Sequence, residues 1–299
     1  MNNLLKSEAI RHGDRLQIIA AHHVQDLEND IKLFAQSKEL NGFQKWIIND
    51  LYDYNIPGAD FPVQSIILMA ITHPFYADVI FVRGGKEYQG KSLVRPYFEE
   101  ADQYLKTFLK QHGYHAQSSN SLPLKRLGVQ SGLSAYGRNN ITYVDGLGSN
   151  FSLAAYFSDV PCEEDAWRNA VTAEMCHSCS ICVDSCPTGA IRKDRFLIDN
   201  QRCLSAINEF PGDFPEWLPS SVHHTCYDCL RCQEKCPMNI GHTDKMDECI
   251  IFTEQETEMI LQGTPVEHLP ESAKQKMYNL GWKDWYEAIP RNIKALMNI

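Results

Sequence analysis

A cysteine pattern that occurs twice constrains the fold of this chain more than any other feature. The first copy consists of Cys176, Cys179, Cys182 and Cys186, followed by Pro187. The second copy consists of Cys226, Cys229, Cys232 and Cys236, followed by Pro237. In this C-x2-C-x2-C-x3-C-P spacing, three thiolates on a tight loop hold three corners of an iron–sulfur cubane, and the fourth reaches a second cluster. The pattern therefore predicts two 4Fe–4S clusters.

Two structural zinc sites are the alternative, because Zn²⁺ also takes four cysteine ligands. Zinc sites usually join two C-x2-C pairs through a longer loop, which is not the spacing seen here. The chain has 11 cysteines in 299 residues, too few for a secreted disulfide scaffold. No signal peptide or membrane-spanning apolar run is expected from the sequence. We therefore expect iron–sulfur clusters in a soluble, cytoplasmic protein.

A ninth cysteine, Cys203, competes for the eight ligand positions. If the repeat alone decides, Cys226 joins the second cluster and Cys203 is left out. The alternative is that Cys203 takes the place of Cys226. Two further cysteines, Cys162 and Cys249, lie outside both copies and are predicted to be small buried apolar residues.

The first 160 residues alternate short apolar runs with amphipathic stretches, which indicates a layer of strands and helices. We expect strands over residues 16–20, 65–71, 79–82, 141–144 and 151–157. We expect helices over residues 24–35, 43–51, 96–112 and 124–130. The sequence thus predicts an α/β domain over residues 1–160, a cluster domain over 161–253, and a helical tail over 254–299 that packs on the body.

The charge balance argues against general binding to nucleic acids or anionic membranes. Lys and Arg total 28 and Asp and Glu total 38, which gives a formal net charge of −10. A strongly anionic chain repels the phosphate backbone over most of its surface.

Three segments of the chain resemble epoxyqueuosine reductases and their relatives, the reductive dehalogenases and corrinoid-protein activators. They are SGLSAYGRNNITYV, CHSCSICVDSCPTGAI with a downstream RCLS, and CLRCQEKCPMN, which together span about residues 122–239. The resemblance implies an α+β fold with an N-terminal nitroreductase-like α/β sheet domain, a ferredoxin-like double-cluster module and a short helical tail. It also implies cobalamin, bound base-off over the sheet as a second cofactor.

The resemblance also implies ligands and binding residues. The first cluster would take Cys176, Cys179, Cys182 and Cys236. The second cluster would take Cys186, Cys203, Cys229 and Cys232, with Cys226 as the spare cysteine. Gly137 would let the backbone approach the corrin, and hydrogen bonds to cobalamin would come from Arg138, Asn139 and Asn140. The alternative is that this Gly-Arg-Asn-Asn segment is only a polar turn before a strand.

The sequence departs from epoxyqueuosine reductases at the proton donor, an aspartate in a V-D-[ST]-x-P segment. Alignment on Gly132 places residues 117–121, QSSNS, at that segment without a carboxylate. About sixty residues follow Cys236, whereas the tRNA-reading enzymes carry a helical-repeat extension there. We therefore expect neither epoxyqueuosine reduction nor a tRNA substrate. Tyr136 is the candidate proton donor, with an ordinary packed or surface tyrosine as the alternative.

The predicted function is that of an oxidoreductase, a cobalamin-dependent reductase of an unidentified small molecule. Electrons would pass from an external ferredoxin or flavodoxin-type donor through two clusters to cobalt. The alternative is an electron-transfer or activating protein that reduces the corrinoid of a partner protein. A plain two-cluster ferredoxin fused to a structural domain is disfavoured, since a carrier needs no α/β platform. The histidine pair His22–His23 is expected to point apart and to serve surface or capping roles.

Overall fold

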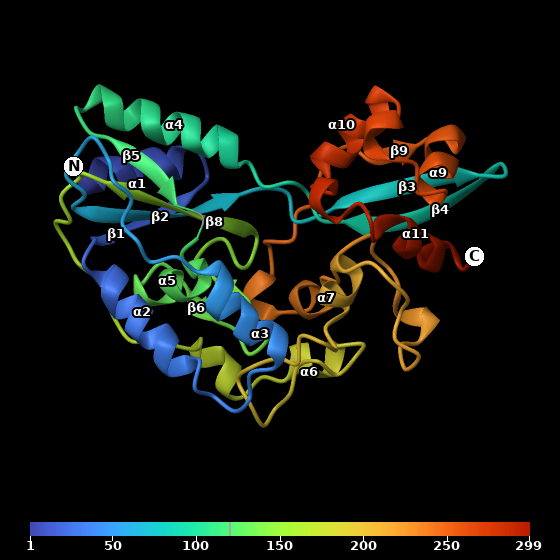
Figure 1. The fold of residues 1–299 in the computed structure, drawn as a ribbon, viewed down its shortest axis with the longest axis horizontal. Coiled ribbons are helices and arrows are strands. Elements are labelled where there is room, and N and C mark those ends of the chain that lie inside the picture. The colour runs from blue at the N-terminus through green and yellow to red at the C-terminus, as the bar shows by residue number, and fades with distance from the viewer. Residues whose placement is uncertain (120) are drawn as a thin grey trace. The chain divides into compact units, whose positions relative to one another are not determined.

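The computed structural model describes residues 1–119 and 121–299, which form two compact units (Figure 1). Unit 1 contains Met1–Thr72 and Tyr97–Cys179, and unit 2 contains His73–Pro96 and Ser180–Ile299. Each unit combines two segments that are distant in sequence. The units therefore divide the chain differently from the predicted boundaries after residues 160 and 253. Among the described residues, no helix has the length and apolar character that crossing a bilayer requires.

Unit 1 is built on an antiparallel sheet with the strand order β1-β2-β8-β5. The strands are β1 (Arg15–Ala20), β2 (Ser65–Thr72), β8 (Phe151–Ser158) and β5 (Ala116–Ser119). Seven of the eight residues of β2 are buried, because β2 lies between two strands and is covered on both faces. The predicted strands over 16–20, 65–71 and 151–157 are confirmed.

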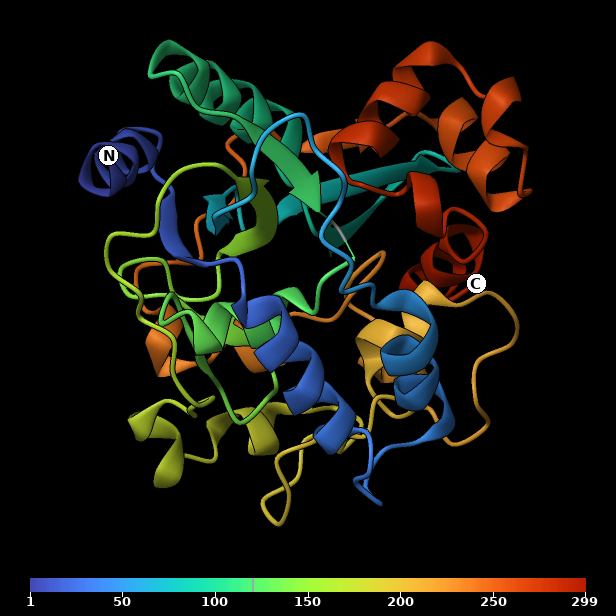
Figure 2. The ribbon, with the colours of Figure 1, turned by 60° about the vertical axis from the view of Figure 1, so that its left-hand side comes forward.

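Helices cover both faces of this sheet (Figures 1 and 2). The helices of unit 1 are α1 (Asn2–Arg11), α2 (His23–Phe34), α3 (Gly42–Trp46), α4 (Phe98–Gln111) and α5 (Leu124–Gln130). Side chains alternate along a strand, so Ile67 and Met69 of β2 pack in the cluster that includes α1 and α4. Ile66 and Leu68 point to the opposite face and join α2 and α5. The helices predicted over 24–35, 96–112 and 124–130 are confirmed.

Unit 2 contains a three-stranded sheet with the order β4-β3-β9. Its strands are β3 (Ala77–Arg83), β4 (Lys86–Ser92) and β9 (Ile250–Phe252), and β9 runs parallel to β3. The tail predicted to be helical forms α9 (Glu254–Leu261), α10 (Glu271–Asn279) and α11 (Ile289–Met297). The core of the unit is a stack of aromatic rings, in which Phe252 lies 5.3 Å from Phe81 and 5.4 Å from Trp282 between ring centroids.

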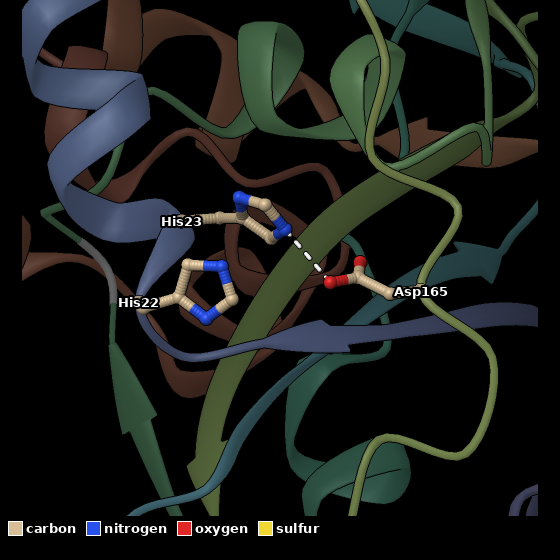
Figure 3. Close-up of side chains that lie close together, drawn as sticks. All are labelled: His22, His23 and Asp165. Atoms are coloured by element: carbon tan, nitrogen blue, oxygen red, sulfur yellow. Dashed lines mark hydrogen bonds and ion pairs between the residues drawn. The ribbon is translucent and has the colours of Figure 1, made fainter.

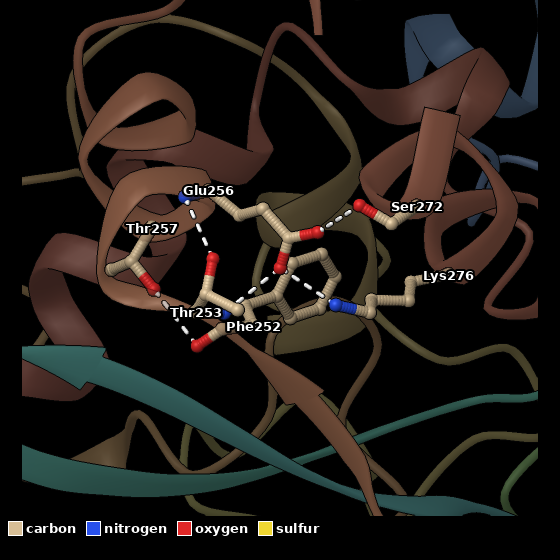
Figure 4. A network of polar contacts seen from close by, with 6 residues as sticks. All are labelled: Phe252, Thr253, Glu256, Thr257, Ser272 and Lys276. Carbon is tan, nitrogen blue, oxygen red and sulfur yellow. Dashed lines mark hydrogen bonds and ion pairs between the residues drawn. The ribbon is translucent and has the colours of Figure 1, made fainter. Parts of the chain in front are cut away.

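A buried carboxylate joins α9 to α10 (Figure 4). Glu256, only 3% exposed, accepts hydrogen bonds from Lys276 Nζ at 2.6 Å, Ser272 Oγ at 2.6 Å and the Thr253 backbone N–H at 2.8 Å. Thr253 and Glu256 form a capping box that starts α9 directly after β9. Burial alone raises the pKa of a carboxyl, but these three contacts outweigh it and hold the pKa of Glu256 below its usual range.

The cysteine-rich part of unit 2 contains short helices joined by turns. They are α6 (Ile181–Ser185), α7 (Leu204–Glu209) and α8 (Arg231–Glu234). Short helices leave many backbone N–H groups near loops, where sulfur atoms accept hydrogen bonds. This arrangement positions the thiols of the candidate site.

Candidate iron–sulfur site

Cys203 is held beside the last cysteine of the first motif. The Asp199 N–H donates to the Ala190 carbonyl at 2.8 Å, and Arg202 Nε donates to the Thr188 carbonyl at 3.0 Å. The Thr188 hydroxyl lies 3.7 Å from the thiol of Cys186. These contacts fold the segment before Cys203 back onto the turn that follows Cys186.

The helix that begins after Cys203 is joined to the second motif. Ser205 Oγ donates to Asp228 Oδ1 at 2.8 Å, and Asn208 Nδ2 donates to the Asp228 carbonyl at 3.0 Å. Asp228 directly precedes Cys229. Burial raises the pKa of Cys229 to about 12, and the negative charges of Cys203 and Cys186 add to the shift. Three thiols of unit 2 are therefore close enough to interact.

The backbone around Cys229 has an unusual conformation. Asp228 has φ +64° and Leu230 has φ +59°, although neither is glycine. Positive φ is costly for a branched side chain, and such residues persist where the surrounding structure imposes them, often at functional sites. The loop thus turns sharply on both sides of the Cys229 thiol before α8 begins.

Cys226 points away into the core of unit 2. Its side chain is fully buried in the cluster that contains Phe81 and Trp282. A Cβ placed on Gly90 of β4 would lie 3.5 Å from the Cys226 sulfur, so the thiol faces that strand. The Cys226 N–H also donates to the Lys91 carbonyl at 2.7 Å, which fixes the residue against β4. Burial raises the pKa of this thiol strongly.

Arg138 holds the first cysteine loop within unit 1. Its guanidinium donates to the carbonyl of Cys176 at 2.5 Å and to that of Cys179 at 3.1 Å. Cys176 lies in a 3-10 turn (Glu174–His177), and Cys182 lies in α6. Arg138 is thus a residue that positions the loop, a role that the sequence did not predict for it.

The rest of the Gly137–Asn140 turn is stabilised by its own contacts. Asn139, 3% exposed, donates to the Tyr143 hydroxyl at 2.9 Å and accepts from the Ile141 N–H at 3.3 Å. A Cβ on Gly137 would lie 2.5 Å from a ring carbon of Tyr143, so only glycine fits. Asn140 takes the left-handed conformation, with φ +59°. These contacts make the segment a tight turn between β6 (Ala135–Tyr136) and β7 (Thr142–Tyr143).

The cysteine thiols and the polar side chains of the Gly137–Asn140 turn differ in what they contact in this structure. Thiols are the ligands that 4Fe–4S clusters take, and Cys186, Cys203 and Cys229 gather in unit 2. Arg138 and Asn139, predicted to bind cobalamin, are engaged with the chain itself. In this structure these two side chains shape the turn and the cysteine loop.

Tyr136 lies next to this turn and carries a shifted pKa. Burial raises its pKa to about 12, and the Arg126 guanidinium opposes the shift. Arg126 is in turn paired with Asp30 through two hydrogen bonds of 2.5 and 2.9 Å. The phenol of Tyr136 therefore keeps its proton at neutral pH and lies near a cation that stabilises the phenolate.

An aspartate that sequence reasoning missed contacts Ser121 through its backbone. The Asp53 N–H donates to the Ser121 carbonyl at 3.1 Å, while the exposed Asp53 carboxylate accepts hydrogen bonds from Asn55 at 2.6 and 2.9 Å. Asn120 lies outside the described residues. No local pattern signals this contact, because its two partners are far apart in sequence.

The two cysteines outside the motifs differ in their exposure to solvent. Cys162 is partly buried, and its thiol lies 3.6 Å from the Ile18 carbonyl, close to the expectation of a small packed residue. Cys249 is exposed, so the prediction that it is buried is wrong. It directly precedes β9, in a short loop whose side chains face solvent.

Comparisons with known proteins agree with this description. The family described as "4Fe-4S double cluster binding domain" matches residues 175–239. The epoxyqueuosine reductase of Bacillus subtilis is 26% identical over 259 residues, covering 79% of this chain and 64% of that protein. The epoxyqueuosine reductase of Shewanella oneidensis is 27% identical, covering 69% of this chain and 51% of that protein. This chain thus spans about half to two thirds of the length of these relatives.

Solved structures show the same fold. A crystal structure of epoxyqueuosine reductase matches with a TM-score of 0.64 and 19% identity, covering 99% of this chain and 82% of that one. A structure of epoxyqueuosine reductase with an epoxyqueuosine-modified tRNA stem loop matches with the same TM-score, identity and coverage. The likeness extends through the first hundred residues, where the sequence alone indicates only a general strand–helix order.

The cysteine motifs and the mixed α/β fold define the class of a double 4Fe–4S cluster protein. Within that class, the chain is similar in sequence and in fold to epoxyqueuosine reductases. The resemblance predicted from the sequence is therefore confirmed, and the predicted oxidoreductase class is that of these relatives. Two 4Fe–4S clusters and cobalamin are the cofactors that this assignment supports.

Two predictions are contradicted by the same relatives. The chain was expected not to reduce epoxyqueuosine and not to act on tRNA, whereas its curated relatives are epoxyqueuosine reductases and a matched structure holds a tRNA stem loop. The first inference failed because the lack of a carboxylate in one short window of the sequence does not decide which side chains folding brings to a site. The second failed because net charge does not describe a local binding surface.

Proposed function

We propose that this chain is a reductase of the epoxyqueuosine reductase type, which reduces an epoxide on a modified nucleoside of tRNA. One observation carries the proposal: Cys203 lies with Cys186 and Cys229, whereas Cys226 faces the core. A plain two-cluster ferredoxin would use Cys226, so this departure supports membership in the reductase family. The sequence likeness to curated epoxyqueuosine reductases supports the substrate.

The proposed ligands of the two clusters follow from the place of Cys203 beside Cys186 and Cys229. The second cluster takes Cys186, Cys203, Cys229 and Cys232, all within unit 2. We assign Cys176, Cys179, Cys182 and Cys236 to the first cluster, as the resemblance implies; all four lie within the matched residues 175–239. Arg138 contributes by holding the carbonyls of the first loop, so that the thiols are oriented before the metal binds.

Reduction of an epoxide takes two electrons and two protons, whether the oxygen leaves as water or remains as an alcohol. Clusters held by these cysteines would supply one-electron transfer from an external ferredoxin or flavodoxin-type donor, and cobalamin, when bound, would supply one-electron chemistry that side chains lack. The sheet of unit 1, which the resemblance implies to be nitroreductase-like, is the proposed platform for that cofactor. The protein must also supply protons where side chains meet the substrate.

Two side chains are proposed as proton sources. Tyr136 keeps its proton at neutral pH, and the nearby Arg126 guanidinium stabilises the phenolate that forms when the proton is transferred. The backbone of Asp53 contacts Ser121, which ends the segment where the resemblance expects an aspartate. A variant that removes one group while the other remains will distinguish them.

The test is turnover by the full chain, loaded anaerobically with iron–sulfur clusters and cobalamin. The substrate is an epoxyqueuosine-modified tRNA stem loop, and the product is measured by mass spectrometry of the released nucleoside. We expect a mass change equal to the loss of one oxygen or the gain of two hydrogens. Unmodified stem loop and a Cys203→Ala variant serve as controls. Absence of either mass change, in protein with its full iron content and bound cobalt, refutes the proposal.

A further inference from the structure

Three side chains of types that can bind metal ions lie close together in unit 1, and none of them is a cysteine (Figure 3). They are His22 and His23 at the start of α2 and Asp165 from the segment after β8. One ligand atom from each lies within 4.8 Å of the other two. The two imidazole centroids are 4.2 Å apart. The expectation that these histidines point apart is therefore wrong, because the ring of His22, at the N-cap of α2, turns toward that of His23.

Both ring nitrogens of His23 contact carboxylates. Nδ1 lies 2.6 Å from Asp26 Oδ2, and Nε2 lies 2.8 Å from Asp165 Oδ2. An ionised carboxylate only accepts hydrogen bonds, and a neutral imidazole has one N–H to donate. One of the two contacts therefore needs either a second proton or a cation. If Nδ1–H donates to Asp26, Nε2 is left as a lone pair directed at Asp165.

The ring and the carboxylate are held in place before any ion binds. Trp167 stacks on His23 with 4.4 Å between ring centroids and 8° between the ring planes. The Arg168 N–H donates to the Gln130 carbonyl at 2.8 Å, which anchors the segment that carries Asp165. His23 is 8% exposed, whereas the other two ligands are exposed to solvent. An ion can thus enter from solvent and meet a fixed imidazole.

We propose that His22, His23 and Asp165 bind one divalent transition-metal ion of the Zn²⁺ type. Two imidazoles and one carboxylate are a zinc donor set that leaves a fourth position for water. Asp26 acts as a positioning residue, because a carboxylate on the second ring nitrogen fixes the tautomer and strengthens the metal bond. The carboxylates of Asp26 and Asp165 balance the two charges of the ion. A bound ion would cross-link the start of α2 to a segment 142 residues later in the chain.

The proposal is tested with Zn²⁺ on the full chain, purified anaerobically with both clusters loaded so that the cluster cysteines are occupied. Zinc and iron are measured per chain after dialysis against graded Zn²⁺ concentrations. We expect one zinc per chain with the iron content unchanged. His22→Ala and Asp165→Asn should lose this zinc, and Asp26→Asn should weaken binding about 10–100-fold. His268→Ala, which removes an exposed histidine of unit 2, is the matched control and should bind as the wild type does.

A thermal melt gives a second measurement. Zinc should raise the melting temperature of the wild type and of His268→Ala, and leave that of Asp165→Asn unchanged. His22 and Asp165 are exposed, so we expect their variants to fold. No zinc on the cluster-loaded wild type overturns the proposal. Equal zinc uptake by the wild type, His22→Ala and Asp165→Asn also overturns it, because the ion would then be bound elsewhere.

Discussion

Replacement of Cys226 and of Cys203 by alanine should have opposite consequences. Cys226→Ala removes a sulfur from a fully buried site against Gly90. Loss of one buried group of this size costs about 0.8 kcal/mol in transfer free energy, and the small cavity adds roughly as much. We therefore expect the free energy of unfolding to fall by about 1–2 kcal/mol, with the iron content unchanged. Cys203→Ala removes a proposed ligand, so the iron content should fall from eight, two clusters of four, to about four.

The assay is iron and sulfide content of anaerobically reconstituted protein, measured beside the melting temperature of the same sample. A cost of 1–2 kcal/mol corresponds to a decrease of about 2–8 °C for a chain of this size. The visible charge-transfer band of the clusters provides a third measurement. The reasoning is refuted if Cys226→Ala loses half of its iron, or if Cys203→Ala retains all of it. Either result would return Cys226 to the second cluster and leave the plain ferredoxin arrangement.

Three further predictions follow from the contacts described above. Tyr136→Phe should lower kcat on modified stem loop about 10²–10⁴-fold with cluster content unchanged; an unchanged kcat would exclude the phenol as donor. Gly137→Ala places a Cβ 2.5 Å from Tyr143 and should destabilise unit 1 by about 1–3 kcal/mol in denaturant unfolding; wild-type stability would contradict this packing. Lys276→Met should cost about 1–3 kcal/mol at pH 7, because Glu256 stays buried without its cation. The pKa of Glu256 in the folded state lies below the ordinary value of 4.5, so the stability that its ionised form contributes is complete above pH 4.5. This stability is lost as the pH falls through the folded-state pKa. An equal cost of the substitution at all pH values would contradict the ion pair.

The spacing of the cysteines predicted the cofactors but left the choice between Cys203 and Cys226 open. That choice depends on β4, whose sequence KEYQGKS is polar and has no apolar alternation, so this strand was not predicted. Only when β4 pairs with β3 does Gly90 present a face on which Cys226 packs. Sequence spacing describes the reach of a thiol along a loop, whereas its direction is set by the strand that covers it.

The long buried strands were predictable for the opposite reason. β2 reads SIILMAIT, and a continuous apolar run of that length has few alternatives to a covered strand. β5, AQSS, has no such pattern and forms because it pairs with β8. The contact between Asp53 and Ser121 belongs to the same class, since it exists only after both segments have folded. Rejection of the epoxyqueuosine reductase activity was based on such a segment and was therefore wrong.

Because β3 pairs with β9, the sheet of unit 2 can be completed only late in synthesis of the protein. Val79 pairs with Ile250, so about 170 residues are made between the two partners. At roughly 5–20 residues per second, the β3–β4 hairpin leaves the ribosome about 10–30 s before β9 can join it. During that interval the apolar edge of β3 is open to strands of other chains. The sheet of unit 2 is therefore completed only after β9 has been synthesised. We expect slower translation or a lower growth temperature to increase the yield of folded protein relative to aggregates.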